Sequence, residues 1–194
     1  MVKLKTIIFI PLMIVVIAAF TACNQEVAET EVIKIVYSEK FLGIAQMTPE
    51  DWVTDLINTG EGNYVDVYVN QDGASVTLEI TDGQRNYWIT SREEILDDLA
   101  TKFSKLGSGY KIEYNDDYSH IDLYYNLQLD AYDAIYYVMY TETFCINQQL
   151  FSGIGHDEWV VSFNIYNSDT GKLVTSGDSN TGLSYTEADW EASM

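Results

Sequence analysis

Residues 127–151, LQLDAYDAIYYVMYTETFCINQQLF, form the longest periodic stretch of the chain and decide its fold. Apolar residues recur there every three or four positions, which is the spacing of one face of an α-helix. This face holds Ala131, Ala134, Ile135, Val138, Met139, Cys145 and Ile146. Tyr136 and Tyr137 would also suit a strand, but the length of the stretch favours a helix. We predict a helix that Gly153 and Gly155 end.

Working outward, residues 110–125 alternate between apolar and polar side chains and predict a β-hairpin before this helix. With residues 116–117 as its turn, the apolar side chains meet on one face of the hairpin. On the reverse face this register places Glu113 opposite His120, where the two side chains form a cross-strand charged pair.

A further hairpin is predicted over residues 63–81, around the turn signal Asn-Gln-Asp-Gly at 70–73. Its apolar and polar residues separate cleanly only when Val67 faces Val76. A slip by one residue would mix the two faces, so the pattern selects this pairing.

The remaining elements follow from local signals. Thr48 and Pro49 are typical of a helix start, and Gly60 is placed to end that helix. Ser91 and Glu94 have the capping-box spacing of a second helix start. The other predicted elements are a strand over 32–38, the body of the second helix up to 106, and a last hairpin formed by 159–166 and 172–175.

Together these elements predict an α+β fold with a single two-layer domain over residues 32–194. Three hairpins and the first strand are expected to form a mainly antiparallel sheet, with three helices packed on it. The tail after residue 177 is polar, and we expect it to be loosely held.

The N-terminal segment has the three parts of an export signal. Lys3 and Lys5 supply a basic start, residues 7–20 supply an apolar run, and small residues follow. The run is shorter than the roughly 20 apolar residues of a spanning helix. We predict a signal peptide over residues 1–22, with an uncleaved anchor helix as the alternative.

Residues 20–23, Phe-Thr-Ala-Cys, resemble the lipobox of bacterial lipoproteins. The resemblance covers only the signal region, and no family is identified for the rest of the chain. It implies cleavage before Cys23 and a diacylglycerol thioether on that residue, which would anchor the protein stably on the extracytoplasmic face of the cell membrane. Residues 23–31 then form the lipidated cysteine and an acidic tether. The alternative is a secreted protein in which this cysteine is coincidental.

The cysteines and the charge narrow the class of protein further. With Cys23 lipidated only Cys145 remains, so no internal disulfide forms; we expect this thiol to be buried in the helix. Of the ten basic residues two precede the cut, whereas all 30 acidic ones follow it, so the mature charge is 8 − 30 = −22. Such a surface repels nucleic acid and anionic lipid headgroups.

Candidate catalytic residues are few. The chain has two histidines and no His-Glu-x-x-His motif, and we predict neither a metal nor a cofactor. His120, with Asp122 or Glu113, is the candidate acid–base pair of a small hydrolase, while cross-strand charge pairing explains the same residues without catalysis.

Tyr64, Tyr68 and Tyr124 project from the predicted sheet on the side opposite its apolar residues. Tyrosine combines an apolar ring with a hydrogen-bonding hydroxyl, which suits contacts with a sugar or a peptide; packing beneath a helix is the alternative. The sequence therefore predicts a lipid-anchored extracytoplasmic module that binds a protein or a cell-wall glycan, with the hydrolase as the second hypothesis. A structural or assembly role stays open.

Overall fold

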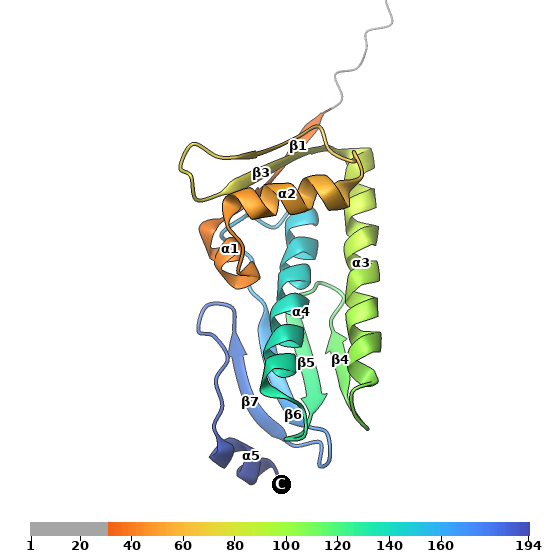
Figure 1. Cartoon of the computed structure of the whole chain (residues 1–194), viewed down its shortest axis with the longest axis vertical. Coiled ribbons are helices and arrows are strands. Elements are labelled where there is room, and N and C mark those ends of the chain that lie inside the picture. The colour runs from red at the N-terminus through yellow and green to blue at the C-terminus, as the bar shows by residue number, and fades with distance from the viewer. Residues whose placement is uncertain (1–30) are drawn as a thin grey trace, which may run out of the picture. The chain divides into compact units, whose positions relative to one another are not determined.

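The computed structural model describes residues 31–194. These residues form an α+β domain with seven strands and five helices (Figure 1). In chain order the elements are β1 (Val32–Tyr37), α1 (Glu39–Ala45), α2 (Pro49–Gly60), β2 (Asp66–Val69), β3 (Val76–Thr81), α3 (Asp82–Ser104), β4 (Lys111–Tyr114), β5 (His120–Tyr125), α4 (Ala131–Phe151), β6 (Ser162–Asn167), β7 (Leu173–Asp178) and α5 (Glu187–Ser193).

The strands form two sheets, so the predicted single sheet is wrong. One sheet has the order β1-β3-β2 and the other the order β4-β5-β6-β7. Pairing is antiparallel except between β5 and β6, which run parallel. The α4 helix lies between these two strands in sequence and carries the chain back to the starting end of β5. The expectation of an uninterrupted series of hairpins missed this crossover.

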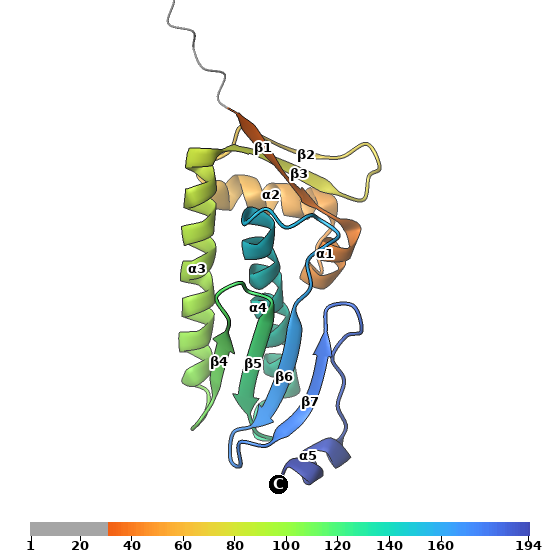
Figure 2. The same ribbon diagram turned by 180° about the vertical axis from the view of Figure 1, so that it is seen from behind.

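Helices α3 and α4 run side by side; α4 passes through the middle of the described domain and α3 lies along one edge in both views (Figures 1 and 2). The four-stranded sheet covers one side of this helix pair. The three-stranded sheet lies across one end of the pair, next to α2. The core therefore fills the space between the two long helices and the inner faces of both sheets. Figure 2 shows the outer face of the four-stranded sheet with no helix in front of it.

The predicted helix over 127–151 is confirmed as α4, which begins at Ala131 after an Asp130 cap. The side chain of Asp130 accepts a hydrogen bond from the backbone N–H of Tyr132 at 2.8 Å. The predicted apolar face is only partly buried: Ile135 is 61 % exposed. The last turns of α4 are instead buried all round, polar residues included, because both sheets and α3 converge there.

The hairpin over 63–81 keeps the predicted faces but not the predicted pairing. Val67 lies opposite Leu78, two residues from the expected partner. The reason is the Asp72 carboxylate, which accepts hydrogen bonds from the backbone N–H of Ala74 at 2.9 Å and of Ser75 at 3.1 Å. These bonds draw both residues into the turn. A shift by two residues preserves the alternation of faces.

The hairpin over 110–125 shifts by two residues for the same kind of reason. Glu113 lies opposite Asp122, not opposite His120. The Asp117 carboxylate accepts from the backbone N–H of Ser119 at 3.1 Å, which lengthens the turn.

Helix α3 starts nine residues earlier than the predicted second helix. Its capping box is formed by Thr81 and Gln84, not by Ser91 and Glu94. The Thr81 hydroxyl accepts from the N–H of Gln84 at 3.2 Å, and the Gln84 side chain accepts from the N–H of Thr81 at 2.9 Å. Strand β3 thus passes directly into α3.

Two short helices, α1 and α5, were not predicted, so the count of three helices is wrong. The tail was expected to be loose, but strand β7 ends only at Asp178, and α5 follows with Trp190 just 3 % exposed. The Trp190 ring contacts Tyr125 with the ring centroids 5.3 Å apart. Besides this contact, Asn167 donates a hydrogen bond to the Ser193 hydroxyl at 3.1 Å and Thr170 donates to the Ser193 carbonyl at 2.6 Å, so α5 is held at both a buried ring and its last turn.

Other local predictions agree with the structure. Strand β1 and the Thr48-capped, Pro49-initiated α2 form where expected. Cys145 is fully buried, and burial raises the pKa of its thiol. Within residues 31–194 no helix is long and apolar enough to cross a membrane. The predicted signal peptide and Cys23 lie outside the described residues.

Candidate functional site

The outer face of the four-stranded sheet carries most of the residues that the sequence singled out. Strands β4, β5 and β6 alternate strictly, so every second side chain points away from α3 and α4. The eight outward side chains are Lys111, Glu113, His120, Asp122, Tyr124, Ser162, Asn164 and Tyr166. We call this set the open face.

His120 lies at the start of β5 and joins two neighbours on the open face. Its Nδ1 is 2.8 Å from the Ser162 hydroxyl, and its Nε2 is 2.9 Å from Asp122 Oδ1. The Ser162 hydroxyl also donates to the Ser119 carbonyl at 3.0 Å. The parallel pairing places His120 directly beside Ser162, although 42 residues separate them. Hydrogen bonds therefore link a serine to a histidine and the histidine to an aspartate.

Asn164 extends this network along β6. Its side-chain amide donates to Asp122 Oδ1 at 2.9 Å and to the Tyr166 hydroxyl at 3.2 Å, and it lies 3.1 Å from His120 Nε2. The polar groups at the centre of the open face are therefore held in one connected arrangement.

Glu113 takes no part in the histidine network. Because the hairpin shifts by two residues, Glu113 lies across from Asp122, and its carboxylate pairs with the Lys111 ammonium at 3.0 Å. Of the two carboxylates proposed as partners for His120, the structure brings only Asp122 to it.

An aromatic stack crosses the same face. The Tyr124 and Tyr166 rings are stacked with centroids 4.7 Å apart and planes 15° apart. The Lys111 ammonium lies 3.8 Å from the centroid of the Tyr124 ring, a cation–π contact. Three adjacent strands therefore contribute one member each, which restricts the rotamers of all three side chains. We call this arrangement the Lys–Tyr–Tyr ladder.

The other two predicted tyrosines lie elsewhere. Tyr64 precedes β2 and packs against the hydrophobic core. Tyr68 lies on the outer face of the three-stranded sheet, where its hydroxyl donates to Glu79 at 3.0 Å. Glu79 also pairs with the Lys34 ammonium at 2.8 Å. The three tyrosines thus belong to three places and form no common surface.

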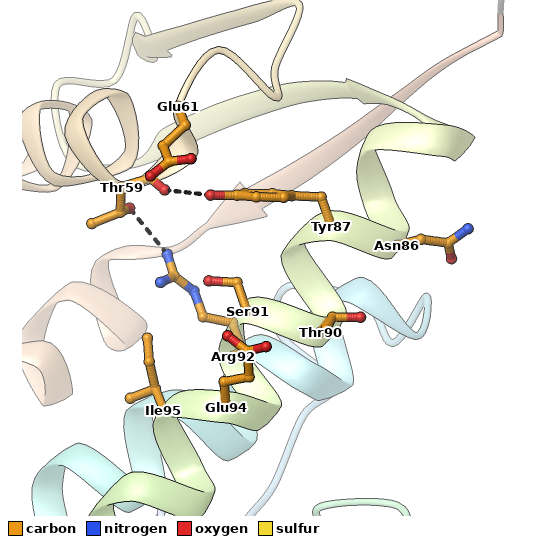
Figure 3. Close-up of a pocket in the computed structure, with 9 residues that line it drawn as sticks. All are labelled: Thr59, Glu61, Asn86, Tyr87, Thr90, Ser91, Arg92, Glu94 and Ile95. Carbon is orange, nitrogen blue, oxygen red and sulfur yellow. Dashed lines mark hydrogen bonds between the residues drawn. The ribbon is translucent and has the colours of Figure 1, made fainter.

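A cavity of about 780 Å³ lies between α2 and α3 (Figure 3). Most of its lining residues carry polar groups, although their apolar atoms also line the wall, and one wall residue is the buried Arg92. The lining residues are Thr59, Glu61, Asn86, Tyr87, Thr90, Ser91, Arg92, Glu94 and Ile95. Sequence analysis missed this site because hydroxyl, amide and charged residues on a helix are ordinarily solvated.

A smaller cavity of about 240 Å³ lies beside α4 and is lined mainly by apolar side chains. Glu142 is the exception, and burial raises its pKa to about 7. The Tyr125 hydroxyl lines the same cavity and donates to the Tyr185 hydroxyl at 3.1 Å.

No protein-family model, curated protein or solved structure matches this chain. Within residues 31–194 no three His, Cys, Asp or Glu side chains gather as a potential metal site. The function must therefore be argued from the geometry of the site.

The open face can do two things chemically. Its ladder and polar network offer a pre-ordered surface to a partner. Its Ser162–His120–Asp122 sequence has the residue types of a nucleophilic triad. Ser162, Asn164 and Tyr166 escaped the sequence analysis, although they alternate along a predicted strand, because their neighbours on β5 depend on a parallel pairing that no local pattern indicates.

We predict that Glu142 makes the stability of the protein pH-dependent. The folded-state pKa of about 7 lies above the usual 4.5, so the folded state binds more protons than the unfolded state between these values. With respect to this group, stability is therefore highest below pH 4.5 and falls by about 3 kcal/mol as the pH rises to 7.

Urea unfolding of Glu142→Gln at pH 5 and pH 8 measures this effect. The variant should lose the part of the pH dependence that Glu142 causes and should be more stable than the parent protein at pH 8. The same change at the exposed Glu191 is the control and should leave the profile unaltered. A Glu142→Gln profile that matches the parent protein would contradict the prediction.

Proposed function

We propose that this chain is a lipid-anchored extracytoplasmic binding protein whose open face docks a protein partner. The observation that carries the proposal is the Lys–Tyr–Tyr ladder beside a connected polar network, on a sheet face that no helix of the described residues covers. Tyrosine is enriched at protein interfaces because its ring and hydroxyl serve both apolar and polar contacts.

The geometry of the ladder favours a protein over a glycan. Sugars stack best on a free aromatic face, whereas the Tyr124 ring has its faces engaged by Lys111 and Tyr166. What remains for a partner is the hydroxyl edge of Tyr124 and the Tyr166 ring, together with the side chains of Asp122 and Asn164. Such a surface suits the mixed polar and aromatic contacts of a protein interface.

Order in the unbound state supports the same proposal. Binding costs about 0.5–1.5 kcal/mol for each flexible side chain that it immobilises. The ladder and the hydrogen bonds of Asn164 already restrict these side chains, so little of this cost remains. The mature charge of −22 speeds the approach of a basic partner.

The anchor is part of the proposal. A diacylated Cys23 would hold the chain at the extracytoplasmic face of the membrane, and residues 24–31 would separate the lipid from β1. The acidic domain would be repelled by anionic headgroups, which leaves its open face available to a partner.

A small hydrolase is the second candidate, because the Ser162 hydroxyl lies 2.8 Å from His120 Nδ1 and His120 Nε2 lies 2.9 Å from Asp122. In this candidate Ser162 is the nucleophile, His120 the base and Asp122 the residue that orients the imidazole. The Ser162 hydroxyl proton must then turn from the Ser119 carbonyl to His120 Nδ1. Neither of the two cavities described above is lined by these three residues.

We predict that photo-crosslinking in intact cells captures a protein at the open face. A photoreactive residue at the exposed Glu113 should yield a protein adduct. The same residue at the exposed Lys34, on the outer face of the three-stranded sheet, is the control and should yield none. Equal adducts from both positions, or a glycan adduct at 113, would contradict the proposed partner class.

Removal of the ladder should weaken that interaction. Tyr124→Ala and Tyr166→Ala each remove a rigid aromatic contact. Each change should lower the affinity for the captured partner about 10- to 100-fold. Tyr68→Ala is the matched control and should bind like the parent protein. Calorimetric titration with the purified partner measures all three; unchanged affinity in both ladder variants would show that the ladder is not the interface.

For the anchor, we predict that mass spectrometry of membrane-associated protein finds a chain that begins at diacylated Cys23. Cys23→Ala should release the protein from the membrane fraction, since a signal peptide alone gives no lipid attachment. A Cys23→Ala protein that stayed firmly bound to the membrane would contradict the lipid anchor.

The hydrolase candidate makes its own prediction. A fluorophosphonate probe should label Ser162, and Ser162→Ala or His120→Ala should each abolish labelling and slow hydrolysis of a p-nitrophenyl ester by at least about 10³-fold. Failure of the parent protein to react with either reagent removes this candidate and leaves the docking proposal untouched.

A further inference from the structure

Arg92 of α3 is a buried arginine without a carboxylate partner among the described residues. The residue is 2 % exposed, and no Asp or Glu oxygen of residues 31–194 lies within 4.0 Å of its guanidinium. Burial lowers its pKa, which expresses the cost of removing the charge from water. Buried charges in proteins are normally paired, so an unpaired one needs a physical explanation.

Neighbouring aromatic rings explain part of this burial. The guanidinium carbon lies 4.9 Å from the centroid of the Trp88 ring and 5.5 Å from that of Phe144. Cation–π contacts offset some of the lost hydration. They supply no oxygen acceptors, however, and an arginine carries five N–H donors that require them.

Most of those donors have no partner in the described residues. The hydrogen bond of Arg92 is a long one, from Nη2 to the Thr59 hydroxyl at 3.5 Å. The Nε atom is buried and has no acceptor. The Asp55 carboxylate on α2 attracts the guanidinium and so offsets part of the free energy lost by burying its charge, but it stays outside ion-pair distance. An oxyanion is the group that satisfies several guanidinium donors at once.

The cavity beside Arg92 gives such an anion room. It measures about 780 Å³, and Figure 3 shows the guanidinium reaching from α3 towards Thr59 of α2. The Ser91 hydroxyl adds a hydrogen-bonding group to the wall beside Arg92, whereas the Asn86 side chain points away from the guanidinium (Figure 3). Arg92 is thus a charged side chain, only 2 % exposed, in the wall of this cavity. Its Nε is out of reach of solvent, so a ligand would bind the terminal guanidinium nitrogens, of which Nη2 makes only the long bond to Thr59.

Two carboxylates in the same wall restrict the class of anion. Glu61 and Glu94 both line the cavity and are both exposed. A dianion such as phosphate is repelled by these residues and by the acidic chain as a whole. A ligand with a carboxylate at one end and an ammonium at the other complements Arg92 and the glutamates together.

We propose that the cavity between α2 and α3 binds a small zwitterion, a free α-amino acid, with its carboxylate on Arg92 and its ammonium on Glu61 or Glu94. The site lies on elements other than the open face, so it stands independently of the docked partner. It gives the chain a small-molecule ligand in addition to a surface for a protein.

Thermal unfolding of the full chain with each free L- and D-α-amino acid in turn identifies the ligand, since a ligand that binds only the folded state raises its Tm. Calorimetry then compares the best amino acid with its methyl ester, its N-acetyl derivative and inorganic phosphate. The ester lacks the anion and the N-acetyl form lacks the cation. Each change should weaken binding about 10- to 100-fold, and phosphate should bind no better than the derivatives.

Variants locate the site. Arg92→Met should bind the amino acid at least about 10-fold more weakly, and its own stability should be equal or higher, because replacing a buried unpaired charge with an apolar side chain is neutral or stabilising. Glu61→Gln and Glu94→Gln together should reproduce the weakening seen with the N-acetyl derivative. Arg85→Met, on the same helix but outside the cavity wall, is the control.

Several outcomes would overturn the proposal. One is that no amino acid raises the Tm. Another is that the methyl ester or phosphate binds as tightly as the amino acid, which would make the site an adventitious one or a simple anion site. If Arg92→Met fails to fold, the double glutamine variant carries the test: unchanged affinity there contradicts the assignment of the ammonium.

Discussion

The rest of the fold depends on the buried amides at the end of α4, residues Asn147, Gln148 and Gln149. Asn147 accepts from the Tyr37 hydroxyl of β1 at 3.1 Å, and Gln148 donates to the Ile89 carbonyl of α3 at 2.8 Å. Gln149 donates to the carbonyls of residues 118 and 160, beside the strands of the second sheet. One helical turn thus joins both sheets and the other long helix, and a buried amide left without these partners would cost about 1–3 kcal/mol.

This junction also decides which surfaces stay free. Because α3 and α4 cover the inner face of the four-stranded sheet, the outer face has no helix over it in the described residues. The crossover through α4 makes β5 and β6 parallel neighbours, which brings Ser162 beside His120 and Tyr166 beside Tyr124. The polar network and the ladder are both consequences of this pairing. The cavity with Arg92 lies apart from the open face, where the end of α2 meets α3.

Sequence analysis predicted local structure well where a short segment carries its own signal. The period of residues 127–151 indicated α4, Thr48 and Pro49 indicated the start of α2, and the apolar setting of Cys145 indicated its burial. Both hairpins kept their predicted faces. Their pairings shifted by two residues because aspartate carboxylates captured backbone N–H groups in the turns, a preference that alternation of faces does not reveal.

The sequence by itself determined the elements and the faces of the strands, since periodicity, capping and turn chemistry act over a few residues. It also determined the strongly acidic charge, which repels nucleic-acid phosphates. Only the tertiary structure decided that residues 31–194 form two sheets and that Ser162 adjoins His120. It alone also decided that Arg92 is buried with no carboxylate of residues 31–194 at ion-pair distance. These features depend on which distant segments meet, and polar side chains change role entirely once a neighbouring element removes them from water.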